Sequence, residues 1–120
     1  MTQGKIIMAI KTLDKMKSQP MPLPLSYKLY KLRKTLQSHW DWQVEQETEL
    51  MNTFGEQTEN GFTVKADKRA EWDSALSAII ETDVEPDWTP VNIELDCGLN
   101  ISVSDLEALD GFVTIGDDER

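Results

Sequence analysis

The chain of 120 residues is poor in the two residue types that build most structural metal sites and disulfides. It has one cysteine, Cys97, and one histidine, His39. A single cysteine excludes an internal disulfide, and this pair alone excludes a structural zinc site. Cysteine usage of this kind is typical of a reducing compartment, so the sequence predicts a cytoplasmic protein.

The sequence also lacks a long apolar run near its N-terminus. The run there covers only residues 6–10 and has a lysine on each side, Lys5 and Lys11. Five residues are too few for the apolar core of a signal peptide, and a membrane-spanning helix needs about 20. We therefore expect no membrane association.

No motif for catalysis or cofactor binding is recognisable. The six glycines are scattered, so no glycine-rich phosphate loop exists. Asp83, Glu85 and Asp87 alternate in a linker without the spacing and glycine of a calcium loop, which favours a solvated acidic loop. His39 has no serine or cysteine partner in a motif. The sequence predicts no catalytic residue, no cofactor and no metal, and hence a protein that is not an enzyme.

Charge is distributed unevenly along the chain. Residues 1–34 contain eight basic residues and one acidic residue, a net charge of +7. Residues 35–120 contain four basic and 21 acidic residues, a net charge of −17, and the whole chain carries −10. The acidic part would repel a long polyanion, so direct nucleic-acid binding is disfavoured, although Tyr27 and Tyr30 lie among the lysines. We expect the basic segment to face an acidic surface of the same molecule, a second copy or another protein.

Apolar periodicity and prolines define the first elements of a mainly helical α+β fold. Apolar residues at helical spacing predict a helix within residues 1–17. Prolines at every second position then predict an extended connector over residues 18–25, because each disfavours helix in the residue before it. These prolines are Pro20, Pro22 and Pro24.

A long helix is predicted over residues 26–54, which contain neither proline nor glycine and are followed by Gly55. A stripe with one polar exception is expected to be buried along its length: Leu29, Leu32, Leu36, Trp40, Val44, Glu47, Met51 and Phe54. Lysines lie early in this helix and acidic residues late, which opposes the helix dipole. The unusual order favours a charge-matched neighbour.

The next two segments complete an antiparallel helical hairpin around the long helix. The Asn60-Gly61 pair predicts a small β hairpin or ordered loop within residues 55–66. A third helix is predicted over residues 67–82, with Asp67 as its N-cap. Its face toward the long helix would contain Trp72, Leu76, Ile79 and Ile80.

Residues 91–115 are predicted to form a strand followed by a short helix. Alternation places Val91, Ile93 and Leu95 toward the core. Two pairs three residues apart are each suited to cap the helix, Ser102 with Asp105 and Ser104 with Glu107. Residues 112–115 form either a strand or an extension of this helix, and residues 116–120 are expected to be a frayed tail. All these elements are assigned to a single domain, 1–120.

The order of these features resembles small accessory proteins of tailed bacteriophages. The resemblance is carried by a short first helix, a proline-containing connector, Tyr27-Lys28-Leu29 at the start of a long helix, Phe54-Gly55-Glu56, the Glu59-Asn60-Gly61 turn, Ile93 to Leu95, and Ile101-Ser102 with Asp105-Leu106. It covers most of the chain, although the four tryptophans and the acidic stretch from Asp83 to Asp87 have no counterpart. It implies a phage accessory role in the host cytoplasm or the virion and contributes no catalytic residue.

The sequence therefore favours a non-enzymatic protein that acts by protein–protein contact, in particle assembly or another structural role. The partner would be a second copy or another protein. The alternative is an acidic inhibitor that mimics nucleic acid and blocks a host nucleic-acid enzyme or a defence system such as CRISPR or restriction. The candidate interaction residues are Lys28, Lys31, Arg33, Lys34, Trp40, Trp42, Glu45, Glu49, Asp83, Glu85 and Asp87.

Overall fold

The computed structural model describes residues 1–59, 61–95 and 97–116. In chain order the elements are α1 (Gln3–Met16), α2 (Leu23–Phe54), β1 (Gly55–Thr58), β2 (Gly61–Val64), a 3-10 turn (Ala66–Lys68), α3 (Arg69–Ile80), β3 (Val91–Ile93), α4 (Val103–Ala108) and β4 (Val113–Ile115). The predicted fold class is confirmed: the chain is mainly helical, with one long helix, a helical hairpin, a β hairpin and a short C-terminal helix.

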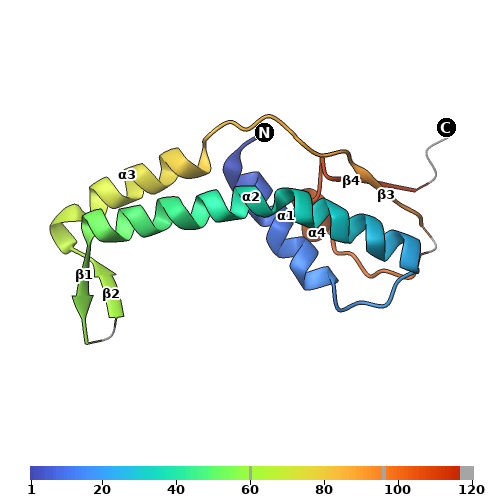
Figure 1. Cartoon of the computed structure of the whole chain (residues 1–120), viewed down its shortest axis with the longest axis horizontal. Coiled ribbons are helices and arrows are strands. Elements are labelled where there is room, and N and C mark those ends of the chain that lie inside the picture. Colours follow the sequence, from blue (N-terminus) through green and yellow to red (C-terminus); the bar gives the residue numbers. More distant parts are fainter. Residues whose placement is uncertain (60, 96, 117–120) are drawn as a thin grey trace.

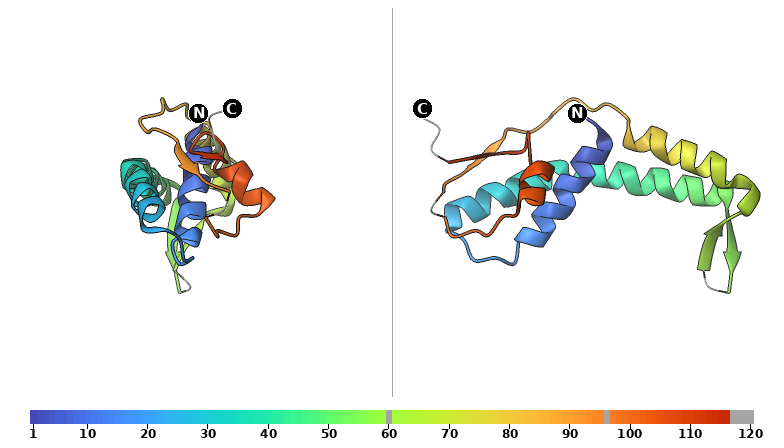
Figure 2. Two further views of the ribbon diagram at one scale, coloured as in Figure 1. Left: turned by 90° about the vertical axis from the view of Figure 1, so that its right-hand side faces the viewer. Right: turned by 180° about the vertical axis from the view of Figure 1, so that it is seen from behind.

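The molecule is elongated, with extents of 55 × 30 × 24 Å, and α2 runs along most of its length (Figure 1). At one end the first half of α2 packs with α1, α4, β3 and β4, and we call this part the body (Figures 1 and 2). At the other end the second half of α2 lies beside α3, and the β1–β2 hairpin projects from it (Figures 1 and 2). We call this part the arm.

Helix α1 fills the centre of the body, as its apolar spacing predicts. The hydroxyl oxygen of Thr2 accepts a hydrogen bond from the backbone N–H of Lys5 and so caps its N-terminus. Its buried apolar side chains pack against those of α2 and of the C-terminal segment, while Met8 is 54% exposed. The core of the body consists of Ile6, Ala9, Ile10, Leu13, Met16, Leu25, Leu29, Leu32, Leu36, Ile93, Leu109, Phe112 and Val113.

Helix α2 begins at Leu23, three residues before the predicted start at residue 26, so the connector is shorter than predicted. Pro24 lies in the first helical turn, where its missing N–H would have no intrahelical partner and its fixed φ suits the helix. Pro22 remains extended as the N-cap. Pro24, which was predicted to lie in the connector, thus belongs to the first turn of α2, and Pro22 directly precedes the helix. The C-terminal end at Phe54 matches the prediction.

The predicted stripe on α2 is buried in the body, whereas in the arm Trp40, Met51 and Phe54 are half-buried and Val44 and Glu47 are exposed. Leu29, Leu32 and Leu36 are buried, but Val44 is 47% exposed. Each step of four residues rotates about 40° further around a helix with 3.6 residues per turn, so the steps from Leu36 to Val44 leave the buried face. Gln43 occupies the buried face instead.

Antiparallel pairing of β1 with β2 confirms the predicted hairpin. Helix α3 then returns along α2, but it begins at Arg69, after a 3-10 turn that contains Asp67. Asp67 is therefore not the N-cap of α3. Lys68 occupies that position without a side-chain cap bond. On the predicted inner face of α3, Ile79 is buried, Trp72 and Leu76 are half-buried, and Ile80 is exposed.

The C-terminal segment closes over the body through a parallel strand pair. β3 and β4 pair in parallel, with Val91 beside Val113 and Ile93 beside Ile115, and α4 lies between them in the chain. Residues 112–115 are thus largely a strand and not an extension of α4. Ile93 is buried as predicted, but Leu95 lies beyond β3 and is 77% exposed, so its expected core position is wrong. Of the expected tail, residues 117–120 lie outside the described residues.

Candidate interaction surface on the long helix

Opposite its buried stripe, α2 has an exposed face that runs from the body into the arm. We call it the outer face of α2 and define it by residues at helical spacing, all of them exposed: Tyr27, Tyr30, Lys31, Lys34, Gln37, Ser38, Asp41, Val44, Glu45, Thr48 and Glu49. Seen along the long axis, α2 lies at one side of the molecule and not in its centre (Figure 2). The outer face is therefore open to a partner.

The first half of the outer face is basic and aromatic. Tyr27 and Tyr30 are each 58% exposed, and their rings are stacked with centroids 6.4 Å apart. The ammonium group of Lys31 lies 5.5 Å from the centroid of the Tyr27 ring, within the range of a cation–π contact. Among the described residues, none forms an ion pair with Lys28, Lys31 or Lys34. Three cations thus remain available beside two exposed aromatic rings.

Part of the basic segment is neutralised within the molecule. In α1, Lys15 pairs with Asp105 of α4 at 2.6 Å, and Lys5 pairs with Asp110 at 3.6 Å. Arg33 pairs with Asp14 at 2.9 Å and also donates to Gln37, so this candidate residue serves the contact between α1 and α2. Among the described residues, the lysines of the basic segment that form no ion pair are Lys11 and Lys17 of the first helix region and Lys28, Lys31 and Lys34 of α2.

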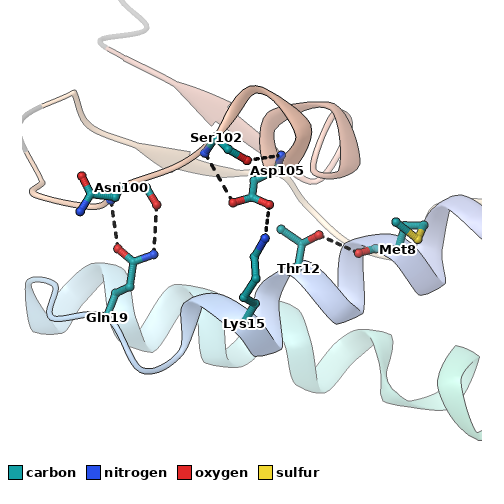
Figure 3. A network of polar contacts seen from close by, with 7 residues as sticks. All are labelled: Met8, Thr12, Lys15, Gln19, Asn100, Ser102 and Asp105. Atoms are coloured by element: carbon teal, nitrogen blue, oxygen red, sulfur yellow. Dashed lines mark hydrogen bonds and ion pairs between the residues drawn. The ribbon is translucent and has the colours of Figure 1, made fainter.

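Asp105 takes part in two contacts, an ion pair with Lys15 and the capping box of α4 with Ser102 (Figure 3). Its carboxylate accepts from Lys15, and the Ser102 hydroxyl accepts from the backbone N–H of Asp105 at 3.1 Å in a capping box. The hydrogen bond from Lys15 is the main cause that lowers the pKa of Asp105, and the Ser102 contacts act in the same direction against burial. Beside it, Gln19 exchanges two hydrogen bonds of 3.0 Å with the backbone of Asn100 (Figure 3).

The second half of the outer face is acidic and surrounds a shallow depression of about 500 Å³ on α2 alone. Asp41, Glu45 and Glu49 line it together with Trp40 and the exposed Val44. Trp40 also packs against the core of the body. Of the candidate residues, the structure thus brings Trp40, Glu45 and Glu49 together, while Trp42 is half-buried and lines no part of this depression.

The acidic linker is exposed to solvent, as expected, and it is also anchored to the protein at two of its three carboxylates. Asp87 Oδ1 lies 3.1 Å from His39 Nε2, and Asp83 pairs with the N-terminal ammonium group at 3.0 Å. The backbone around Asp83 also forms a bridge with Thr2. Glu85 is exposed. Asp83 and Asp87 thus hold the linker in place. Their partners, the N-terminal ammonium group and His39, do not belong to the outer face of α2.

His39 has a structural position. Trp88 meets the His39 ring edge-on at 6.3 Å, stacks on the buried Phe112 at 4.7 Å and donates to the carbonyl of Gly111. Among residues 1–59, 61–95 and 97–116, no group of three His, Cys, Asp or Glu residues is placed to hold a metal ion.

A second hollow lies where the body meets the arm. This groove of about 720 Å³ is open and mainly apolar, with Ile7 and Met8 from α1 and Leu76 and Ile80 from α3. Its rim includes Lys5, Lys11, Glu47 and Glu107, with both signs of charge. No part of the described chain indicates which molecule would fill it.

The candidate residues chosen from the sequence omit seven residues of the outer face: Tyr27, Tyr30, Gln37, Ser38, Asp41, Val44 and Thr48. A helical projection centred opposite Leu32 and Leu36 would have found them, because all lie on the far side of the helix. The described helices include none that is long and apolar enough to cross a membrane. No protein-family model, no curated protein and no solved structure matches this chain.

Proposed function

We propose that this protein is a non-enzymatic accessory protein of the phage type, which acts by protein–protein contact through the outer face of α2. The observation that supports this most directly is that Lys28, Lys31 and Lys34 form no ion pair with any described residue and lie beside exposed Tyr27 and Tyr30. Exposed aromatic residues are enriched in protein contact surfaces, and complementary charges give such contacts their direction. The phage origin rests on the sequence resemblance, with action in the host cytoplasm or the virion.

Particle assembly is the role we favour, since the molecule is elongated and α2 offers an extended exposed face along it. The charge order along α2 is also better suited to a protein than to a nucleic acid. A polyanion that followed the basic half would meet Asp41, Glu45 and Glu49 within the same helix.

One observation favours a second candidate, an acidic decoy for a host nucleic-acid enzyme. Residues 41–81, which form most of the arm, contain ten acidic and three basic residues, a net charge of −7. Two of the three basic residues, Lys68 and Arg69, pair with acids on α3 itself. The arm therefore presents its surplus carboxylates over an elongated shape, which a basic groove would attract.

Particle incorporation tests the proposed function. Tagged protein is expressed in cells in which the encoding virus replicates, and purified particles are probed for the tag. We expect the wild-type chain to be found in particles and the Lys31→Glu/Lys34→Glu variant to be lost from them. The control Lys17→Glu/Lys65→Glu changes two exposed lysines elsewhere by the same charge and should be retained.

Absence of the wild-type chain from particles would overturn the assembly role. If the chain instead co-purified with a host nuclease, and if Asp41→Lys/Glu45→Lys abolished that association, the decoy would replace it. Steep weakening of that association with salt would be expected of a nucleic-acid mimic.

A further inference from the structure

We propose that the partner of the outer face of α2 is a second copy of the same chain, bound antiparallel about a two-fold axis that passes beside Ser38. This inference rests on the proposed function, because it names the partner of the same surface. It follows from the order of the charges and from their spacing about one residue.

The charges of the outer face are self-complementary. Lys31 lies seven residues before Ser38 and Glu45 lies seven after it, so each is two helical turns from the centre. Lys34 and Asp41 lie four residues before and three after the same centre. A two-fold axis at Ser38 turns the basic half of one copy onto the acidic half of the other. Lys31 then faces Glu45 of the second copy, and Lys34 faces Asp41.

The aromatic and apolar residues fit the same arrangement. Tyr27 lies eleven residues before Ser38 and Glu49 lies eleven after it, so the tyrosine rings meet the last turn of the acidic half. Tyr27, Tyr30 and Val44 are all about half exposed in the single chain. Burial of such surface between two helices provides the non-directional part of the association, while the charges fix its direction.

Antiparallel pairing also accounts for the charge order along α2. Within one chain, lysines near the N-terminus and acids in the second half are placed unfavourably for the helix dipole. In the antiparallel pair, the lysines of each copy lie beside the C-terminal half of the other helix, and its acids lie beside the opposite N-terminal half. Each set of charges thus lies beside charges of the opposite sign on the other copy. A two-fold contact of this kind closes on itself and ends at a dimer.

The other described surfaces discussed above differ from the outer face of α2. The groove between α1, α3 and α4 is mainly apolar and has charges of both signs on its rim. The acidic linker is engaged with His39 and the N-terminal ammonium group. The outer face of α2 is the described surface on which both signs of charge and exposed aromatic rings are ordered along one element.

Paired charge reversals test the inference with the full-length chain. Sedimentation velocity is measured from about 1 to 500 µM protein in 0.1 M NaCl, where charges about 10 Å apart still interact, and in 1 M NaCl, where that range falls to about 3 Å. We expect a concentration-dependent dimer that weakens at least tenfold at the higher salt concentration. In Lys31→Glu/Lys34→Glu the charged residues of the outer face are all acidic, and in Asp41→Lys/Glu45→Lys all of them except Glu49 are basic. Each should be monomeric alone.

The two variants mixed in equal amounts should associate, because every opposed pair is again of opposite sign. Lys17→Glu/Lys65→Glu and Glu56→Lys/Glu59→Lys alter net charge equally at exposed sites elsewhere and should dimerise as the wild type does. Circular dichroism identifies any variant that loses helix. A wild-type chain that is monomeric throughout would overturn the inference, as would folded reversal variants that still dimerise alone or fail to associate when mixed. A monomer that is still incorporated into particles would leave the proposed function intact.

Discussion

The ammonium group of Lys15 in α1 lies 2.6 Å from the carboxylate of Asp105 in α4, and this ion pair joins residues 90 positions apart. The same carboxylate belongs to the capping box that starts α4. One side chain therefore fixes a short helix to the central helix of the body. Six residues of helix alone are too short to be stable in water, so α4 depends on this anchorage.

Asp105 predicts a pH dependence of stability. Because Lys15 lowers its pKa in the folded state, the contribution to stability is complete above the unfolded value of 3.8 and is lost as pH falls through the lower folded value. We expect Asp105→Asn to lower Tm at about pH 7 and to differ less from the wild type near pH 2. Thermal unfolding followed by circular dichroism measures both. Glu107→Gln, on the same helix and exposed, serves as the control. A gap between Asp105→Asn and the wild type that is independent of pH would contradict the account.

The choice of cap for α4 is also testable. Ser102 caps the helix through Asp105, while Ser104 is exposed within it. We expect Ser102→Ala to lower the free energy of unfolding by about 1 kcal/mol, the usual cost of a lost N-cap, and Ser104→Ala to change it little. Urea unfolding gives both values. Equal losses in the two variants would show that the capping box does not stabilise the chain as described.

Gly4 allows α1 to approach α3 closely. A Cβ atom at this position would lie 2.5 Å from Cγ2 of Ile80 and 3.3 Å from the Ile80 carbonyl oxygen. We expect Gly4→Ala to destabilise the protein by about 1 kcal/mol, since overpacking outweighs the gain in helix propensity. In an Ile80→Ala background the clash with Cγ2 is gone, so Gly4→Ala should become neutral or stabilising. If the two changes were additive in urea unfolding, the close contact would play no role.

A buried amide pair joins α1 to the middle of α2. The Gln3 side chain donates to the carbonyl oxygen of His39 at 2.8 Å and to Oε1 of Gln43 at 3.4 Å. Gln3→Leu should cost about 1 to 3 kcal/mol, because Gln43 is left buried without its donor. Gln3→Leu/Gln43→Leu should recover part of this loss, as both polar groups are then absent. A double variant with the full sum of the two single losses would contradict this coupling.

The sequence predicted the helices well because their signals are local. The spacing of Leu29, Leu32 and Leu36 defines the buried side of α2 in the body, and Gly55 marks its end. The prediction was wrong at Val44, because successive steps of four residues rotate the position around the helix, away from the buried face. In the arm, the position of α3 determines which residues of α2 face inward. Pro24 was assigned to the connector because a proline can either end one helix or begin the next.

Contacts between distant segments were beyond prediction. The parallel pairing of β3 with β4 involves three residues on each side and depends on how α4 crosses the body. The pairings of Lys15 with Asp105 and of His39 with Asp87 join parts of the chain that no periodicity connects. By contrast, the opposite charges of the two halves of α2 are visible in the sequence. The structure adds that Tyr27, Lys31, Lys34, Asp41 and Glu45 share one exposed face.

Cross-linking at the proposed two-fold axis tests this central claim most directly. Ser38 is the position at which a residue would meet its own counterpart in an antiparallel α2 pair. In a Cys97→Ser background, Ser38→Cys should form an intermolecular disulfide rapidly under mild oxidation. Lys31→Cys alone should not, but it should cross-link when mixed with Glu45→Cys. Rapid self-cross-linking at residue 31, or none at residue 38 while the chain dimerises, would contradict the antiparallel arrangement.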